Sequence, residues 1–302
     1  EKLEHKNVGF IQGYQTKFLS LLLFVRKLTS GCFLRGYINN LVNVNRMGRI
    51  VFVWVFFLLA GCQTAQTSEK LSSASLESPD HKNWDVLLKK WVSKEGWVDY
   101  KGFLTEKDKL ESYLRELSTN SPDNSWGESE KLAYWINAYN AFTVKLILDH
   151  YPLESITDLH TIPVVATVWK KKFFQIGGEE MSLHIIEHKI LRKEFDEPRI
   201  HFAINCASIS CPVLRREAYT VDKLETQLLE QAQLFLSDES RNRISTDRVK
   251  VSQIFLWFRG DFTKEVSLID FLNKYAEVEI DKSAKVGYLS YDWGLNETTN
   301  PG

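Results

Sequence analysis

One stretch limits the possible folds of this chain more than any other, a helical pattern over about residues 127–150 that is apolar on nearly all sides. Its large side chains are Leu132, Trp135, Ile136, Tyr139, Phe142, Val144, Leu146 and Ile147. A helix that is apolar around most of its circumference is buried, because it has no face to turn toward water. We therefore expect a central buried helix with the rest of the domain packed around it.

Two asparagines, Asn137 and Asn140, interrupt this apolar helix, and buried amides need hydrogen-bond partners. A second polar island, residues 205–210, lies inside the otherwise apolar stretch 199–212. Since buried polar groups cost least when they satisfy each other, we expect both asparagines to face this stretch. The predicted pocket residues are Asn137, Asn140, Asn205 and Ser208.

The stretch 199–212 has two parts. Ile200, Phe202 and Ile204 alternate with other residues, which predicts a core strand. After the polar loop, Pro212 favours the first turn of a helix, with Cys211 at the N-cap. Because many sites lie where a strand leads through a loop into a helix, we expect any chemistry of this protein here.

In the remaining sequence, helical patterns come first and short strand patterns follow. Helices are predicted at 81–93, 104–117, 183–195, 220–237 and 266–275, and strands at 172–176, 180–182 and 285–293. Gly177-Gly178 is predicted to be the hairpin turn between the first two strands, and a further hairpin is predicted at 243–252. This order predicts an α+β fold. We expect a single domain in which the long buried helix packs on short mixed or antiparallel strands.

A signal-peptide pattern lies inside the chain. Arg49 precedes an apolar run at residues 50–60, which is too short to span a bilayer. The run ends in Leu59-Ala60-Gly61-Cys62, the pattern of a bacterial lipobox, whose cysteine carries the lipid. We predict an upstream segment outside the mature protein (1–46), a lipoprotein signal peptide (47–61), a flexible tether (62–81) and a globular domain (82–302).

These patterns predict a bacterial envelope protein anchored by lipid at Cys62. Gln63 is not the Asp that retains some lipoproteins on the inner membrane, so we expect the outer membrane, facing the periplasm. The 38 basic and 39 acidic residues give no field that would attract nucleic acid. No phosphate-binding glycine motif occurs, and we expect no cofactor. The expected partners are membrane lipid and an unidentified small molecule or peptide.

Cys206 and Cys211 are the cysteines left in the predicted globular domain. In an oxidising compartment two spare cysteines tend to pair, so we expect a disulfide between them. Closing such a small loop contributes about 2–3 kcal/mol of stability. The first functional hypothesis is a binding or structural domain with a disulfide-braced pocket, in which His188 and His201 are ordinary core residues.

The second hypothesis is a cysteine-dependent hydrolase or transferase with Cys211 or Cys206 as nucleophile. A helix N-terminus would favour the Cys211 thiolate, with His201 or His188 as base and Glu187 as the group that orients it. All seven histidines precede Cys206, whereas papain-like and transglutaminase-like enzymes place the histidine after the cysteine.

A third hypothesis is a zinc metallohydrolase. His184, Glu187 and His188 form an H-x-x-E-H string on a predicted helix, a pattern that binds zinc through two histidines one turn apart. Because a string of five residues has little specificity, we predict no metal site.

Several separated motifs resemble the domain of unknown function family 547. They are Trp135-Ile136-Asn137-Ala138-Tyr139-Asn140-Ala141, Ser182-Leu183 with Ile186-Glu187-His188, the stretch 198–212, Trp257 with Asp261-Phe262, and Tyr291-Asp292-Trp293. The resemblance covers about residues 128–296, with the motifs in the family's order. It implies the family's fold and an envelope-anchored bacterial setting, and it implies no particular chemistry.

The lipobox yields a direct prediction. Replacing Cys62 with Ser removes the atom that would carry the lipid, so the protein should move from the membrane fraction to the aqueous fraction after cell lysis. Fractionation with detection by antibody measures this. An unchanged distribution, together with an intact peptide that crosses the 61–62 bond, would contradict lipid anchoring at this residue.

Overall fold

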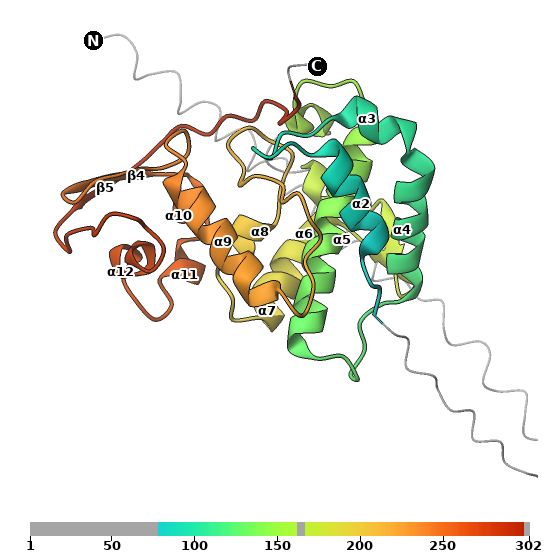
Figure 1. Cartoon of the computed structure of the whole chain (residues 1–302), viewed down its shortest axis with the longest axis horizontal. Helices are drawn as coiled ribbons and strands as arrows, with labels where there is room; N and C mark the ends of the chain where they lie inside the picture. The colour runs from blue at the N-terminus through green and yellow to red at the C-terminus, as the bar shows by residue number, and fades with distance from the viewer. Residues whose placement is uncertain (1–77, 162–166, 299–302) are drawn as a thin grey trace, which may run out of the picture. The chain divides into compact units, whose positions relative to one another are not determined.

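The computed structural model describes residues 78–161 and 167–298, which form helices and two small sheets (Figure 1). The predicted α+β fold is confirmed. The α-helices are α2 (Lys82–Trp91), α3 (Tyr100–Thr105), α4 (Lys107–Thr119), α5 (Glu128–Leu148), α6 (Leu183–Ile185), α7 (Arg192–Glu194), α8 (Ile200–Ala203), α9 (Leu224–Ser237), α10 (Ile254–Trp257), α11 (Arg259–Phe262) and α12 (Leu268–Asn273). Two 3-10 helices, η1 (Ile156–Leu159) and η2 (Val168–Lys170), and a π-helical segment, η3 (Ile186–Leu191), complete the helical elements of these residues. The strands are β1 (Phe174–Ile176), β2 (Glu179–Met181), β3 (Arg243–Ile244), β4 (Arg248–Val251) and β5 (Lys285–Tyr288).

The predicted signal peptide, the lipobox and residues 62–77 of the predicted tether lie outside the described residues. Within the described ranges, no helix combines the length and the apolar character needed to cross a membrane.

Helix α5 is the buried helix predicted from the sequence. Every residue from Leu132 to Leu148 is buried except Lys145. Helices α3 and α4 pack against it, as do α6 and η3, and Figure 1 shows α5 in the middle of this group. Tyr134 donates a hydrogen bond to the Leu117 carbonyl (2.6 Å), which fixes α5 against the end of α4.

The strands form two small sheets. β1 and β2 pair as an antiparallel hairpin around Gly177 and Gly178, whose φ angles of 59° and 82° suit glycine. β4 pairs antiparallel with β3 and parallel with β5, so this sheet is mixed. Its buried Val249 and Val251 belong to a second apolar core, to which Phe202 of α8 also contributes. Helix α8 therefore joins the core around α5 to the core beside the mixed sheet.

The first part of the stretch 199–212 was predicted to be a strand, and this prediction is wrong. Residues 200–203 form α8, and all four side chains are buried. The N–H groups of His201 and Phe202 bond to the carbonyls of Pro198 (3.3 Å) and Arg199 (2.9 Å). No described strand pairs with this segment, so its backbone groups find their partners within the turn.

The prediction that Pro212 begins a helix is also wrong, and Cys211 is not at a helix N-terminus. The next helix, α9, begins at Leu224. The segment between Pro212 and α9 is held by a side chain of α9, because Gln231 donates to the carbonyl of Val213 (3.1 Å). Fixed from α9 in this way, the segment after Pro212 does not coil into a helical turn.

Asn140 connects α5 to the loop that carries the cysteines. Its amide donates to the Ala203 carbonyl (3.0 Å), and its carbonyl accepts the N–H of Asn205 (2.8 Å). Asn137 does not reach this loop. It donates to the carbonyl of Tyr219 (2.8 Å) and accepts the N–H of the same residue (3.0 Å). The expectation that both asparagines face the stretch 199–212 therefore holds for Asn140 and fails for Asn137.

The Asn140 contacts generate a stability prediction. Asn140→Ala leaves the Asn205 N–H and the Ala203 carbonyl without partners in a buried place, which should lower the free energy of unfolding by about 2–4 kcal/mol. Chemical denaturation measures the loss. Asn124→Ala, at an exposed position, is the matched control and should change stability by no more than about 0.5 kcal/mol. A loss at Asn140 as small as that of the control would contradict the structural role of this amide.

Candidate functional site

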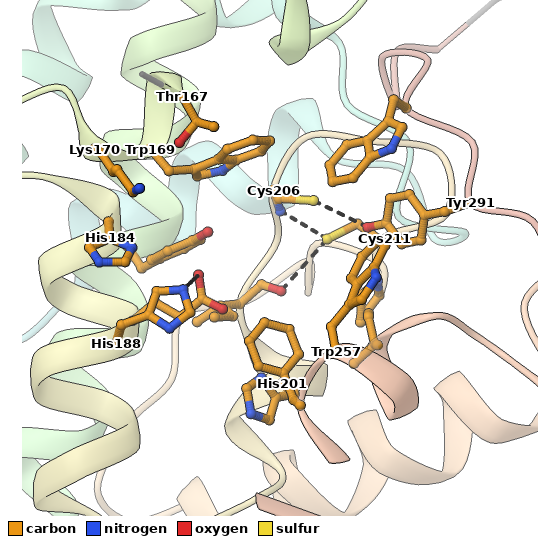
Figure 2. A pocket seen from close by; sticks show the side chains of 17 residues that line it. Thr167, Trp169, Lys170, His184, His188, His201, Cys206, Cys211, Trp257 and Tyr291 are labelled. Atoms are coloured by element: carbon orange, nitrogen blue, oxygen red, sulfur yellow. Dashed lines mark hydrogen bonds and ion pairs between the residues drawn. The ribbon is translucent and has the colours of Figure 1, made fainter. Parts of the chain in front are cut away.

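A cavity of about 320 Å³ lies beside the cysteine loop. Figure 2 shows side chains pointing into it from η2, from the α6–η3 segment, from the loop and from the residues after β5. Its lining consists of Tyr139, Thr167, Trp169, Lys170, His184, Glu187, His188, His201, Ile204, Cys206, Cys211, Pro212, Ile254, Trp257, Phe258, Tyr291 and Trp293. The fold thus brings both cysteines together with residues from distant parts of the sequence.

The loop backbone is held from two sides. Asn205 donates from its side chain to the Pro212 carbonyl (2.7 Å) and accepts from Asn296 (3.2 Å). The same side-chain oxygen accepts the N–H of Ala207 (2.9 Å), whose φ of 64° is left-handed. A left-handed conformation is uncommon for a residue with a Cβ, and residues in strained conformations cluster at functional sites. Here it lies between Cys206 and Ser208, whose side-chain Sγ and Oγ atoms are only 3.1 Å apart.

Cys206 lies in a cluster of hydrogen-bonding groups. Its sulfur is 3.1 Å from Ser208 Oγ and 3.3 Å from Tyr291 Oη, and Ser208 also donates to Tyr291 (3.1 Å). The thiol of Cys211 hydrogen-bonds to the same sulfur. This bond from Cys211 lowers the pKa of Cys206, and the bonds from Ser208 and Tyr291 add to the effect although burial opposes it. Cys206 is partly exposed, so the site combines a thiol of lowered pKa with access from the cavity.

Cys211 has the opposite character. Only 4% of it is exposed, and burial raises the pKa of its thiol well above the ordinary value. Its sulfur accepts the N–H of Cys206 (2.9 Å) and lies 3.9 Å from the Ile204 carbonyl. Both cysteines are free in this structure. The structure therefore brings the two predicted partners together, and the disulfide between them stays a prediction.

The predicted pairing of a cysteine with His201 or His188 is not what the structure shows. His201 Nε2 bonds to Asp261 Oδ2 (2.8 Å), and its ring stacks on Phe258. His188 Nδ1 accepts a hydrogen bond from Arg192 (2.7 Å). In the described part of the chain, no hydrogen bond joins either cysteine to a histidine.

Asp261 holds His201 directly and holds His188 through Arg192. It accepts hydrogen bonds from both His201 and Arg192, the latter through two nitrogens. Although burial works against the charged form, these bonds hold the pKa of Asp261 well below its ordinary range. Burial also lowers the pKa of His201, and burial followed by the charges of His184 and Arg192 lowers that of His188 to about 4. Both imidazoles are therefore neutral at pH 7.

Glu187 lies in the cavity wall with 8% of its surface exposed. Burial, and then the charge of Cys206, raise the pKa of its carboxyl group to about 8. Arg192 and a hydrogen bond from Tyr139 oppose this rise without cancelling it. Glu187 is thus protonated at pH 7 and can donate a proton. It was predicted to orient a histidine, but its nearest contact to His188 is 3.9 Å, longer than a hydrogen bond.

The zinc hypothesis finds no ligand set among residues 78–161 and 167–298. The rings of His184 and His188 are close, with centroids 4.4 Å apart. However, no group of three or more His, Cys, Asp or Glu side chains in these ranges is arranged to hold a metal ion. Nδ1 of His188 already accepts a hydrogen bond from the cationic Arg192, so this nitrogen is not free to bind a metal ion.

The predicted pocket residues do not line the cavity but hold the segments around it. Asn137, Asn140, Asn205 and Ser208 are all buried, and none of them is part of the cavity lining. Three of them fix the cysteine loop, and Asn137 fixes the segment around Tyr219.

Sequence reasoning missed the aromatic wall. Trp257, Tyr291 and Trp293 pack on one another with ring centroids 4.5–5.8 Å apart, and Trp169 lies 5.5 Å from Trp293. Trp257 is 46% exposed, unusual for a residue of this size. The signal was present in the motifs Trp257 with Asp261-Phe262 and Tyr291-Asp292-Trp293, which served only to identify a family. These motifs lie far from the cysteines in the sequence, so the sequence did not indicate that they line the same cavity.

Residues 124–236 match the family model described as "Protein of unknown function, DUF547". The match supports the assignment of this region to the domain-of-unknown-function family that the motifs resemble. It includes α5, η3 and both cysteines, while Trp257, Tyr291 and Trp293 lie beyond it. No curated protein and no solved structure matches the chain.

Proposed function

We propose that this domain is a cysteine-dependent hydrolase or transferase that acts on acyl groups, with Cys206 as the nucleophile. One observation carries the proposal: the Cys206 sulfur is accessible from a cavity and is surrounded by Ser208, Tyr291 and Cys211, which stabilise its thiolate. A thiolate formed in this way needs no histidine to remove its proton. Cys211, the other candidate, is too deeply buried to attack a substrate.

Glu187 supplies the second group that acyl transfer requires. It lines the same cavity, and the environment shifts its pKa up while shifting that of Cys206 down. Two groups whose pKa values are driven apart in one cavity suit an acid and a nucleophile. The thiolate attacks the carbonyl carbon, and the proton of Glu187 passes to the leaving group as the carbon–heteroatom bond breaks. The resulting carboxylate then takes a proton from the water or acceptor that cleaves the thioester.

The lining of the cavity indicates the kind of acyl group. Rings of Trp169, Trp257, Tyr291 and Trp293 form much of it, so a flat or apolar group would bury its surface against them. Lys170 adds a positive charge to the lining.

The setting we propose is the bacterial cell envelope, with a lipid anchor at Cys62 and the outer membrane as the location. The apolar run, the lipobox and the polar segment that follows it support this part of the proposal.

A disulfide-braced binding domain is the second candidate function. The position of Cys211 favours it, because its sulfur accepts the N–H of Cys206 and so lies beside its predicted disulfide partner. In that state the aromatic cavity would bind a small molecule or peptide, and Cys206 would have no nucleophilic role.

Two esters of one acyl group test the enzyme proposal, p-nitrophenyl phenylacetate and ethyl phenylacetate. The protein is the full chain with Cys32→Ser and Cys62→Ser, so that only the two cysteines of the site remain. We expect mass spectrometry to find one phenylacetyl group per chain, on Cys206, and none after Cys206→Ala. Acylation elsewhere, or none, would contradict the proposal.

Glu187→Gln distinguishes an acid from a structural residue. The alkoxide of the ethyl ester needs a proton to leave and p-nitrophenolate does not, so the variant should slow the ethyl ester about 100-fold and the aryl ester far less. Glu194→Gln, at an exposed position on the neighbouring α7, is the matched control. Equal losses with both esters would show that Glu187 does not act as an acid.

A further inference from the structure

The two cysteines of the site differ in exposure although the Cys211 sulfur lies against the backbone of Cys206. Both cysteines line the cavity, but Cys206 is partly exposed whereas only 4% of Cys211 is exposed. The Cys206 N–H bonds to the Cys211 sulfur (2.9 Å), and Figure 2 marks this bond with a dashed line beside the cavity. We infer that Cys206 and Cys211 form a dithiol couple that exchanges with external disulfides, with Cys206 attacking and Cys211 resolving. This activity goes beyond the proposed acyl transfer and shares only the nucleophile with it.

The loop keeps the resolving cysteine in place. Arg241 donates to the carbonyls of Cys211 (2.8 Å) and Ile209 (2.6 Å), and the Cys211 N–H bonds to the Ser208 carbonyl (3.1 Å). These bonds fix the backbone of Cys211, and its side chain is buried, so the partner we infer for it is a sulfur already attached to Cys206. This fixed order of reaction distinguishes a resolving cysteine from a second nucleophile.

The polar contacts divide the roles in the same way. The Ser208 and Tyr291 hydroxyls lie 3.1 and 3.3 Å from the Cys206 sulfur, whereas the Cys211 sulfur lies against the backbone N–H of Cys206 and the carbonyl of Ile204. A low pKa at the accessible thiol and a high pKa at the buried one agree with this division. The rate of attack by a thiol depends on its thiolate fraction and on its nucleophilicity, so the two thiols differ in readiness to attack.

The reaction balances without an additional oxidant. The Cys206 thiolate attacks one sulfur of a disulfide R–S–S–R′, forming Cys206–S–S–R and releasing R′–S⁻. The departing thiolate takes the proton of Cys211, and the Cys211 thiolate then attacks the Cys206 sulfur and releases R–S⁻. Two electrons pass from the dithiol to the substrate disulfide, which leaves as R′–SH and R–S⁻. The chain keeps the Cys206–Cys211 disulfide that the sequence predicted, as the oxidised state of the couple.

The substrate class is a disulfide of a small thiol or of an exposed protein segment, presented at the mouth of the cavity. Glutathione disulfide and insulin represent these two sources. Faster oxidation of the couple by one of them identifies the source, and oxidation by neither would overturn the inference.

The decisive experiment uses three proteins, each the full chain with Cys32→Ser and Cys62→Ser: this background, Cys211→Ser in it, and Cys206→Ser in it. Each is incubated in mixtures of reduced and oxidised glutathione, quenched with acid, alkylated and weighed by mass spectrometry. We expect the background to pass from two thiols to one internal disulfide, without a lasting glutathione adduct. Cys211→Ser should hold one glutathione on Cys206, and Cys206→Ser should react about 100-fold more slowly because its remaining thiol is buried.

Three results would overturn the inference: two free thiols across the whole series, a lasting glutathione adduct in the background protein, or equally fast adduct formation on Cys211. Cys211→Ala is a second resolving-cysteine variant, and circular dichroism shows whether each variant is folded. The outcome is separable from that of the proposed function. If an ester acylates Cys206 but no internal disulfide forms, only the redox inference fails. If the internal disulfide forms but no ester acylates Cys206, only the proposed acyl transfer fails.

Discussion

The hydrogen bond between Asn140 and the Asn205 backbone is the contact on which the site depends. Asn140 belongs to the buried helix α5, and Asn205 begins the loop that carries both cysteines. Asn205 passes this constraint on through its own side chain, which holds the Ala207 N–H and the Pro212 carbonyl. A loop anchored in this way can keep Ala207 in the left-handed region and the Cys211 sulfur against the Cys206 backbone, because the core fixes its ends.

The surroundings of the cavity raise the pKa of the Glu187 carboxyl group and lower the pKa of the Cys206 thiol. Burial raises the pKa of Glu187, which has too few donors to stabilise its charge, whereas Cys206 is surrounded by groups that hydrogen-bond to its sulfur. The histidines near them are occupied, His201 with Asp261 and His188 with Arg192. A proton donor and a thiolate can therefore coexist at pH 7 without a histidine between them, and the same thiolate could serve acyl transfer and disulfide exchange.

The sequence predicts the parts of this protein that depend on local pattern. The periodicity of α5 predicts a buried helix, and Gly177-Gly178 predicts the β1–β2 hairpin, because both follow from neighbouring residues. Residues 200–203 are apolar on alternate positions, yet they form a helix because two cores surround them. The site residues Tyr291 and Asp261 reach Cys206 and His201 only through the tertiary fold. No spacing along the chain could indicate those contacts.

In the proposed site, hydroxyl and thiol donors, and not a histidine, stabilise the Cys206 thiolate. The rate of Cys206 alkylation by iodoacetamide against pH tests this, in the full chain with Cys32→Ser and Cys62→Ser. We expect a single sigmoid whose midpoint lies below the ordinary cysteine pKa of about 8.5, and Tyr291→Phe should raise that midpoint. A midpoint at or above 8.5 that Tyr291→Phe leaves unchanged would contradict the account, as would a second inflection from a paired histidine.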